Sequence, residues 1–180
     1  MRFLKLFAIS IAVIILITGL IGIFLPKDFS VRRSISINAS NELIHNFVGN
    51  LDNWEQWTTW KLDDPSMLIF KGSKSQGVGA SQSWKGDSGE GKLEITESSA
   101  EKGIVYDLYF DGGDQKSVSS MLYSKDGDNT LVTWSMSGSM EIPVLGGYFV
   151  MMIDSMIGQM FDRGLKRLKT VSEKKANKLL

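Results

Sequence analysis

The sequence predicts an α+β fold, a long helix packed on an antiparallel sheet of about seven strands, preceded by one transmembrane helix. Three observations predict it. Residues 6–25 carry no charge, short runs between residues 31 and 140 have strand-like patterns, and about thirty proline-free residues follow Pro143. We therefore divide the chain into an anchor, residues 1–27, and a ligand-binding domain, residues 28–180.

The N-terminal apolar run has the length of a membrane span. At about 1.5 Å per residue, residues 6–25 extend roughly 30 Å, the thickness of a bilayer's hydrocarbon core. We predict an uncleaved single-pass anchor. A cleaved signal sequence is one alternative, although no small-residue cleavage site precedes Pro26; a buried core helix is the other. Basic residues flank both ends, and because only five residues precede the span, we expect the domain on the extracytoplasmic side.

The first strand and a short helix follow the anchor. Residues 31–38 alternate, which predicts a strand, and Ser40 then caps an amphipathic helix that ends near Asp52. We expect the next three tryptophans to close one end of the sheet, with their indole N–H groups bonded locally. Contact with the membrane surface is the alternative. These tryptophans are Trp54, Trp57 and Trp60.

Six further strand-like runs are separated by turns that contain glycine, asparagine or aspartate. Several are short and evenly spaced, so we predict an antiparallel meander. The runs are residues 67–71, 80–85, 92–98, 104–110, 117–124 and 130–140. By alternation, the inward faces of the fourth and sixth runs include Tyr106, Leu108, Phe110, Trp134 and Met136.

The proline-free stretch after Pro143 predicts a helix of roughly 45 Å. At 100° per residue its apolar side chains share one stripe, which we expect to be buried against the concave face of the sheet. Methionines make such a surface deformable, as suits a ligand that is not always present, and a methionine-rich core helix is the alternative. The stripe consists of Leu145, Phe149, Met152, Ile153, Met156, Ile157 and Met160.

Charge is unevenly distributed along the chain. Residues 28–162 hold ten Lys and Arg against nineteen Asp and Glu, whereas residues 163–180 hold seven against one. The acidic part argues against nucleic-acid binding. The basic end could reach anionic lipid, but cations also suit a helix C-terminus, and we expect a solvated helix end.

The residues give little support to catalysis. His45 is the single histidine, and the chain contains no cysteine, which excludes zinc sites of the usual composition and every Ser-His or Cys-His nucleophile system that needs a second titrating partner. His45 falls on the polar side of its helix, so we expect it to be exposed. Asp107 lies in a predicted strand and should face away from the interior, and Asp111 lies just beyond the end of that strand. We predict a hairpin turn at residues 126–129, and no catalytic residue, metal or cofactor.

A set of motifs extends through the chain after residue 29. It comprises Asp52-Asn53-Trp54 with Trp57 and Trp60, Gly77-Val78-Gly79-Ala80 with Trp84 and Gly86, residues 91–97, Thr133-Trp134-Ser135-Met136 with Gly138, and Phe161-Asp162-Arg163-Gly164-Leu165. These motifs resemble the polyketide cyclase/dehydrase branch of the START-like (SRPBCC) superfamily. The resemblance implies a helix-grip fold, in which a curved sheet wraps a long C-terminal helix around a deep apolar cavity, with two short helices after the first strand. It does not imply cyclase activity, because many relatives only carry ligands.

Aromatic and methionine side chains that converge between sheet and helix predict an apolar ligand pocket, with a packed core as the alternative for each. The candidate ligand-binding residues are Trp84, Tyr106, Leu108, Phe110, Trp134, Met136, Phe149, Met152, Met156 and Met160. We expect membrane-anchored binding of a hydrophobic small molecule or lipid. An enzyme that acts on a hydrophobic substrate and a protein-interaction module with a filled core remain the alternatives. The sequence identifies neither the ligand nor a protein partner.

Overall fold

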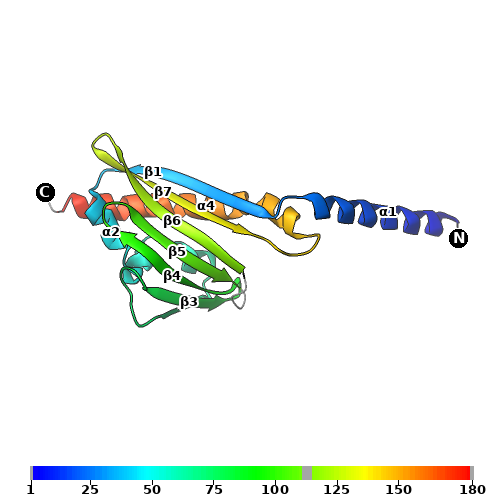
Figure 1. Ribbon diagram of the computed structural model, residues 1–180, viewed down its shortest axis with the longest axis horizontal. Helices are drawn as coiled ribbons and strands as arrows, with labels where there is room; N and C mark the ends of the chain where they lie inside the picture. Colours follow the sequence, from blue (N-terminus) through cyan, green and yellow to red (C-terminus); the bar gives the residue numbers. More distant parts are fainter. Residues whose placement is uncertain (1, 111–114, 179–180) are drawn as a thin grey trace.

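The computed structural model describes residues 2–110 and 115–178 (Figure 1). Helix α1 (Arg2–Phe24) extends away from the rest of the chain along the long axis, and most of its side chains are exposed. It is the one helix in the described part that is long and apolar enough to span a membrane. It contains nearly all of the run from which the anchor was predicted.

Seven strands in the described part form one antiparallel sheet, in the order β1-β7-β6-β5-β4-β3-β2. Strands β2 to β7 form the predicted meander. Strand β1 lies at the edge of the sheet and pairs with β7, from Asp28 opposite Ser139 to Ile37 opposite Thr130. The strands are β1 (Asp28–Ile37), β2 (Leu68–Lys71), β3 (Ser81–Gly86), β4 (Gly89–Ser99), β5 (Gly103–Phe110), β6 (Gln115–Asp126) and β7 (Asn129–Ser139). The turn predicted at residues 126–129 joins β6 to β7.

Three short helices connect β1 to β2: α2 (Asn41–Val48), the 3-10 helix η1 (Leu51–Gln56) and α3 (Trp60–Asp63). Ser40 caps α2 as predicted, because its Oγ accepts from the Leu43 N–H. The indole N–H of Trp54 donates to the Val48 carbonyl at 2.8 Å, and that of Trp57 donates to the Phe47 carbonyl at 3.2 Å. Both indoles are fully buried, so the membrane-contact alternative is wrong for them.

Helix α4 (Gly146–Ala176) runs along the concave side of the sheet beside β1 (Figure 1). The helix-grip fold is therefore confirmed. The predicted stripe is only partly buried, because Met152 is 58% and Met156 67% exposed. The stripe is wider than the strip of helix that the sheet can cover. The sheet takes the side that contains Ile153 and continues into the second half of α4, where Phe161, Leu165 and Leu168 are also buried.

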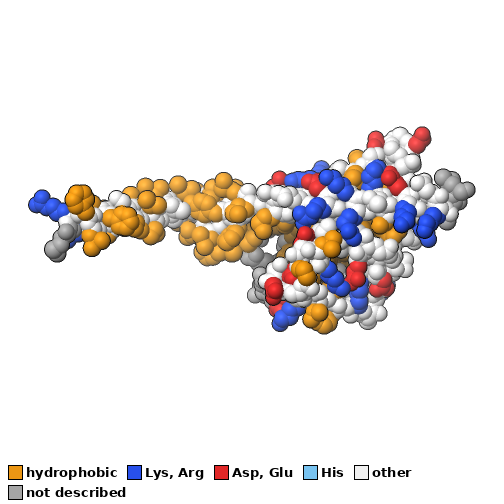
Figure 2. Space-filling view, turned by 180° about the vertical axis from the view of Figure 1, so that it is seen from behind, with side chains coloured by type: hydrophobic (Ala, Val, Ile, Leu, Met, Phe, Trp, Pro, Cys, Tyr) orange, Lys and Arg blue, Asp and Glu red, His pale blue; other side chains and the backbone are white. Residues whose placement is uncertain are grey.

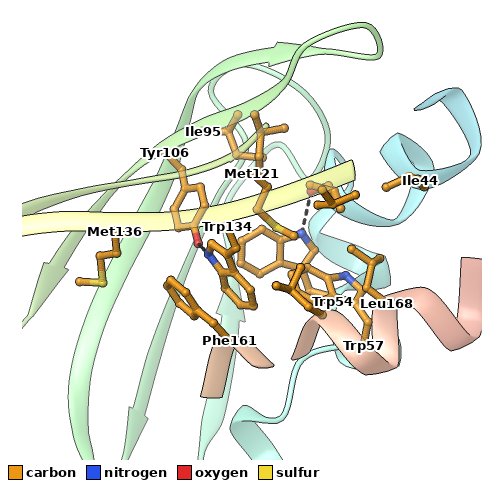
Figure 3. Close-up of a cluster of buried hydrophobic side chains, with 14 of the residues drawn as sticks. Ile44, Trp54, Trp57, Ile95, Tyr106, Met121, Trp134, Met136, Phe161 and Leu168 are labelled. Atoms are coloured by element: carbon orange, nitrogen blue, oxygen red, sulfur yellow. Dashed lines mark hydrogen bonds between the residues drawn. The ribbon is translucent and has the colours of Figure 1, made fainter. Parts of the chain in front are cut away.

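The interior near α2 is filled with aromatic rings (Figure 3). Trp134 stacks on Phe161 with 4.0 Å between ring centroids, and Trp57 meets Trp134 edge-on at 5.3 Å. The Trp134 indole N–H donates to the Tyr106 hydroxyl at 2.9 Å, and burial raises the pKa of Tyr106 to about 12. This half of the sheet–helix space is a packed core rather than part of a deep cavity.

Arg33 joins β1 to α4. Its guanidinium donates two hydrogen bonds of 3.0 Å to the Asp154 carboxylate and one of 3.3 Å to Asp162. The guanidinium packs on Gly158, where an added Cβ would collide with it. Arg33 also holds the pKa of Asp154 below its usual range, because the paired carboxylate is stabilised in its charged form.

Candidate ligand-binding site

An apolar pocket lies between the sheet and α4, at the end of the domain nearest α1. Its volume is about 460 Å³, within the range of pockets that hold small molecules. Figure 3 shows Met136 at the edge of the aromatic core, to one side of Trp134 and Phe161. The lining consists of Phe29, Phe110, Ser117, Met136, Ser139, Met140, Ile142, Ile153, Met156 and Ile157.

The ends of four strands, β1, β5, β6 and β7, and one helix face position these side chains. Phe29 lies at the start of β1, opposite Gly138 near the end of β7. Gly138 leaves room for it, since an added Cβ there would lie only 3.0 Å from the Phe29 ring. Phe110 ends β5. Ile153 and Ile157 come from successive turns of α4, so they lie one above the other on the opposite wall.

The described lining of the pocket is largely apolar. Among the residues that the structure describes, no ionisable side chain lines the pocket, and its polar side chains are Ser117 and Ser139. An apolar lining with two hydroxyl groups suits a hydrophobic or amphipathic molecule, whose polar atoms the serines can bind.

Two larger hollows, of about 630 and 620 Å³, lie at the other end of the domain, near α2 and the C-terminal part of α4. Their linings are mostly polar and include Asn38, Asn41, Asn46 and Gln56. Both linings include charged side chains such as Glu42, whereas the described lining of the pocket beside α1 has none, so that pocket is the better candidate for a hydrophobic ligand.

Three of the ten predicted ligand-binding residues line this pocket: Phe110, Met136 and Met156. Tyr106, Leu108 and Trp134 are buried, and Met160 packs half-buried against the same core. Phe149 and Met152 are exposed on α4. Trp84 lies near the sheet edge, with its ring 5.8 Å from those of Trp60 and Phe110.

Most of the lining was not predicted from the sequence. Phe29 precedes the alternating run at residues 31–38, and Met140 and Ile142 lie at or beyond the end of β7. These residues come together because β1 pairs with β7. A sequence pattern reports each strand but not this pairing of the first strand with the last.

The prediction that His45 is exposed is wrong. It is half-buried between α2 and the sheet, with Nδ1 3.3 Å from the Tyr123 hydroxyl and Nε2 3.1 Å from Ser98 Oγ. It lies outside the pocket lining. Asp107 faces away from the interior as predicted and pairs with Lys116 at 2.7 Å, while Asp111 lies outside the described residues. Within the described ranges, no cluster of three or more His, Cys, Asp or Glu could hold a metal ion.

Solved structures share this fold at low sequence identity. A protein from Chromobacterium violaceum is 12% identical, with a TM-score of 0.59, over 80% of this chain and 96% of its own. KanY is 14% identical, with a TM-score of 0.60, over 81% and 98%. The di-domain ARO/CYC protein StfQ from the steffimycin biosynthetic pathway is 7% identical, with a TM-score of 0.64, over 84% of this chain and 53% of its own. At these identities the likeness shows the fold alone.

No curated protein matches the chain significantly in sequence. A family does match it, over the whole sheet and most of α4. The matched residues are 28–173, and the description of the family is polyketide cyclase/dehydrase and lipid transport. The match covers most of the chain, and the structure has the fold that the sequence motifs predict; the chain belongs to this family.

Proposed function

We propose that this protein is a membrane-anchored binding protein for an apolar or amphipathic, lipid-like small molecule. The domain of residues 28–180 holds the molecule in the pocket between the sheet and α4, and α1 tethers the domain to a bilayer. The family description supports hydrophobic ligand binding in general. The observation that carries the proposal is the apolar pocket of about 460 Å³, which remains open beside a core that is otherwise filled.

The two other functions considered have weaker support. An enzyme would need acid–base or nucleophilic groups at the ligand, and the described lining offers two serine hydroxyls with no ionisable partner among them. A protein-interaction module agrees with the filled aromatic half of the interior but gives no reason for an open apolar pocket in the other half.

Two methionines on α4 allow a matched test of the pocket. Met156 and Met151 are 67% and 68% exposed, but of these two only Met156 lines the pocket. Met156→Trp should place an indole over the pocket and reduce ligand uptake, whereas Met151→Trp adds the same bulk elsewhere. Because both positions are exposed, we expect the free energy of unfolding to change by less than about 1 kcal/mol in either variant.

The measurement is photo-crosslinking of the full chain in phosphatidylcholine nanodiscs with a diazirine-bearing fatty acid. Mass spectrometry should locate adducts on residues that line the pocket in the wild type and in Met151→Trp, and far fewer in Met156→Trp. Adducts confined to α1 in all three proteins, or equal pocket labelling in the two variants, would contradict the proposed function.

The proposed orientation places the domain outside the cytoplasm, with the short segment before α1 inside. A reporter enzyme that folds only outside the cytoplasm, fused after Leu180, should therefore be active. A cytoplasm-dependent reporter at the same position should be inactive. The opposite pair of results would reverse the orientation and leave the binding proposal unchanged.

A further inference from the structure

The first turn of α4 rests directly against the last turn of α1. The Tyr148 hydroxyl donates to the Thr18 carbonyl at 2.8 Å. An added Cβ at Gly22 would collide with the Val144 carbonyl oxygen, and one at Gly147 would collide with the Leu25 side chain. Residues 144–148 therefore contact residues 18–25 of the apolar run, and Figure 1 shows the start of α4 near the end of α1 that adjoins the domain.

This contact sets the depth of α4 once α1 spans a bilayer. Gly147 then lies at the edge of the hydrocarbon core, and the Tyr148 hydroxyl reaches below that edge. The first charged residue of α4 is Asp154, seven residues or about 10 Å farther along the helix axis. The headgroup layer on one side of a bilayer is roughly 5–8 Å thick, so the uncharged start of α4 is long enough to cross it.

The surface of this segment is suited to lipid rather than to water. Leu145, Phe149, Met151 and Met152 are each at least 47% exposed. Figure 2 shows hydrophobic side chains continuing from α1 onto the near end of the domain, with charged side chains beginning farther along. Soluble proteins seldom expose apolar groups together in this way.

The backbone that leads into α4 is strained. Val144 has a φ of 64°, which a β-branched residue rarely adopts. Such a conformation persists only where the surroundings impose it, and here it places the Val144 carbonyl against Gly22. The turn therefore holds the start of α4 beside the end of α1.

We propose that residues 142–153 form a second membrane contact, embedded in the interface of the leaflet in which α1 ends. We further infer that the pocket takes a lipid acyl chain directly from that leaflet. Met140, Ile142 and Ile153, at the edges of this segment, also line the pocket, which places the pocket beside the headgroup layer. This inference rests on the proposed function and names the source of its ligand.

The absence of cysteine from the chain permits single-site labelling of the full-length protein. The variants are Met152→Cys on the proposed contact, Ser139→Cys in the pocket, Ile15→Cys in α1 and Thr170→Cys on the distal half of α4. Each carries the fluorophore NBD and is reconstituted into phosphatidylcholine vesicles, with or without a phosphatidylcholine that bears a nitroxide on its acyl chain.

We expect the nitroxide lipid to quench the labels at positions 15, 152 and 139 several-fold more than the label at position 170. Introducing Met156→Trp should reduce quenching at position 139 and leave it unchanged at position 152. If position 15 is quenched while 152 and 139 behave like 170, the inference is overturned and the anchor stands. If position 15 also behaves like 170, the anchor of the proposed function fails together with the inference.

Discussion

The His45 ring lies in a half-buried, polar contact between α2 and the sheet. Its two ring nitrogens approach the hydroxyl groups of Tyr123 and Ser98, and the ring packs against Gly49. Burial lowers the pKa of His45, because the surroundings disfavour the imidazolium ion. The neutral ring can accept at one nitrogen and donate at the other, which fits two hydroxyl partners. We assign His45 a structural role.

This environment predicts a pH dependence of stability. The folded-state pKa lies below the unfolded value of about 6.5, so between the two the unfolded chain binds a proton that the folded chain does not. The free energy of unfolding should fall as the pH drops below about 6.5 and level off below the folded pKa. His45→Gln should remove this dependence between about pH 5 and pH 6.5, where no other side chain has its ordinary pKa.

The measurement is urea unfolding of the full chain in detergent micelles, followed by tryptophan fluorescence at several pH values. Asp154 and Glu173, whose pKa values are lowered by ion pairs, lose their contribution only as the pH falls below their ordinary range, near 4. An equally steep dependence in His45→Gln would show that another group is responsible.

Single residues were predicted well where the local pattern determines their surroundings. Trp54 and Trp57 were expected to bond locally, and each donates to a carbonyl of α2. The surroundings of His45 were not predicted, because its partners lie 53 and 78 residues away in the sequence. The periodicity of one helix cannot indicate which part of the sheet its polar side will meet.

At the scale of elements, Arg33 is the connection that a pattern of apolar residues does not reveal. It lies on the concave face of β1 among apolar neighbours, and its guanidinium reaches Asp154 and Asp162 on α4. Its side chain is 27% exposed, but those of Asp154 and Asp162 are 63% and 49% exposed, so solvent screens these ion pairs considerably. The ion pairs fix α4 against β1 on the turns of the helix that also line the pocket.

A double-mutant cycle tests this connection. Asp154→Asn should lower the free energy of unfolding of the wild type by a small amount, because solvent screens an ion pair whose carboxylate is this exposed. Gly158→Ala places a methyl group where the guanidinium packs, so Arg33 should move away from Asp154. In the Gly158→Ala background, Asp154→Asn should not measurably change the free energy of unfolding. The Gly158→Ala change itself should favour the helix by up to about 1 kcal/mol. Additive effects of the two changes would contradict the proposed coupling.

The order and kind of the elements could be predicted, and the burial of α4 could be predicted only in part. Strand-like runs bounded by turn residues, together with alternation at residues 31–38, located all seven strands because each of these patterns is local. The apolar stripe on α4 did not show which of its sides meets the sheet and which continues past it. Met152 and Met156 are exposed because the sheet covers the side that contains Ile153. Only the packed structure decides between the two sides.

At the scale of the whole molecule, the core and α1 are separate. The buried core cluster begins at Val31 and extends to Leu168, and α1 contributes no residue to it. We therefore expect residues 27–180 to fold without α1. The sequence predicted this division from the apolar run alone, but the contact between α1 and the start of α4 could not be foreseen, since no local pattern joins residues about 125 positions apart.

Deletion of residues 1–26 should leave a domain that unfolds cooperatively and keeps its near-ultraviolet circular dichroism. The deletion also uncovers the side of α4 on which Gly147 and Tyr148 contact α1. We therefore expect the truncated chain to be folded but to bind phosphatidylcholine vesicles reversibly in a flotation assay. A chain that shows no cooperative transition in urea would mean that α1 is required for folding.

The length of α4 has a consequence for the basic end of the chain. Its 31 residues extend about 46 Å, and the end farthest from α1 carries Lys174 and Lys175. With α1 in a bilayer, those lysines stand several Debye lengths from the lipid surface, where anionic headgroups no longer attract them. A tilt of the domain about the α1–α4 junction would bring them down to the headgroups. The close packing at Gly22 and Gly147 therefore also decides whether the domain stands upright or lies flat on the bilayer.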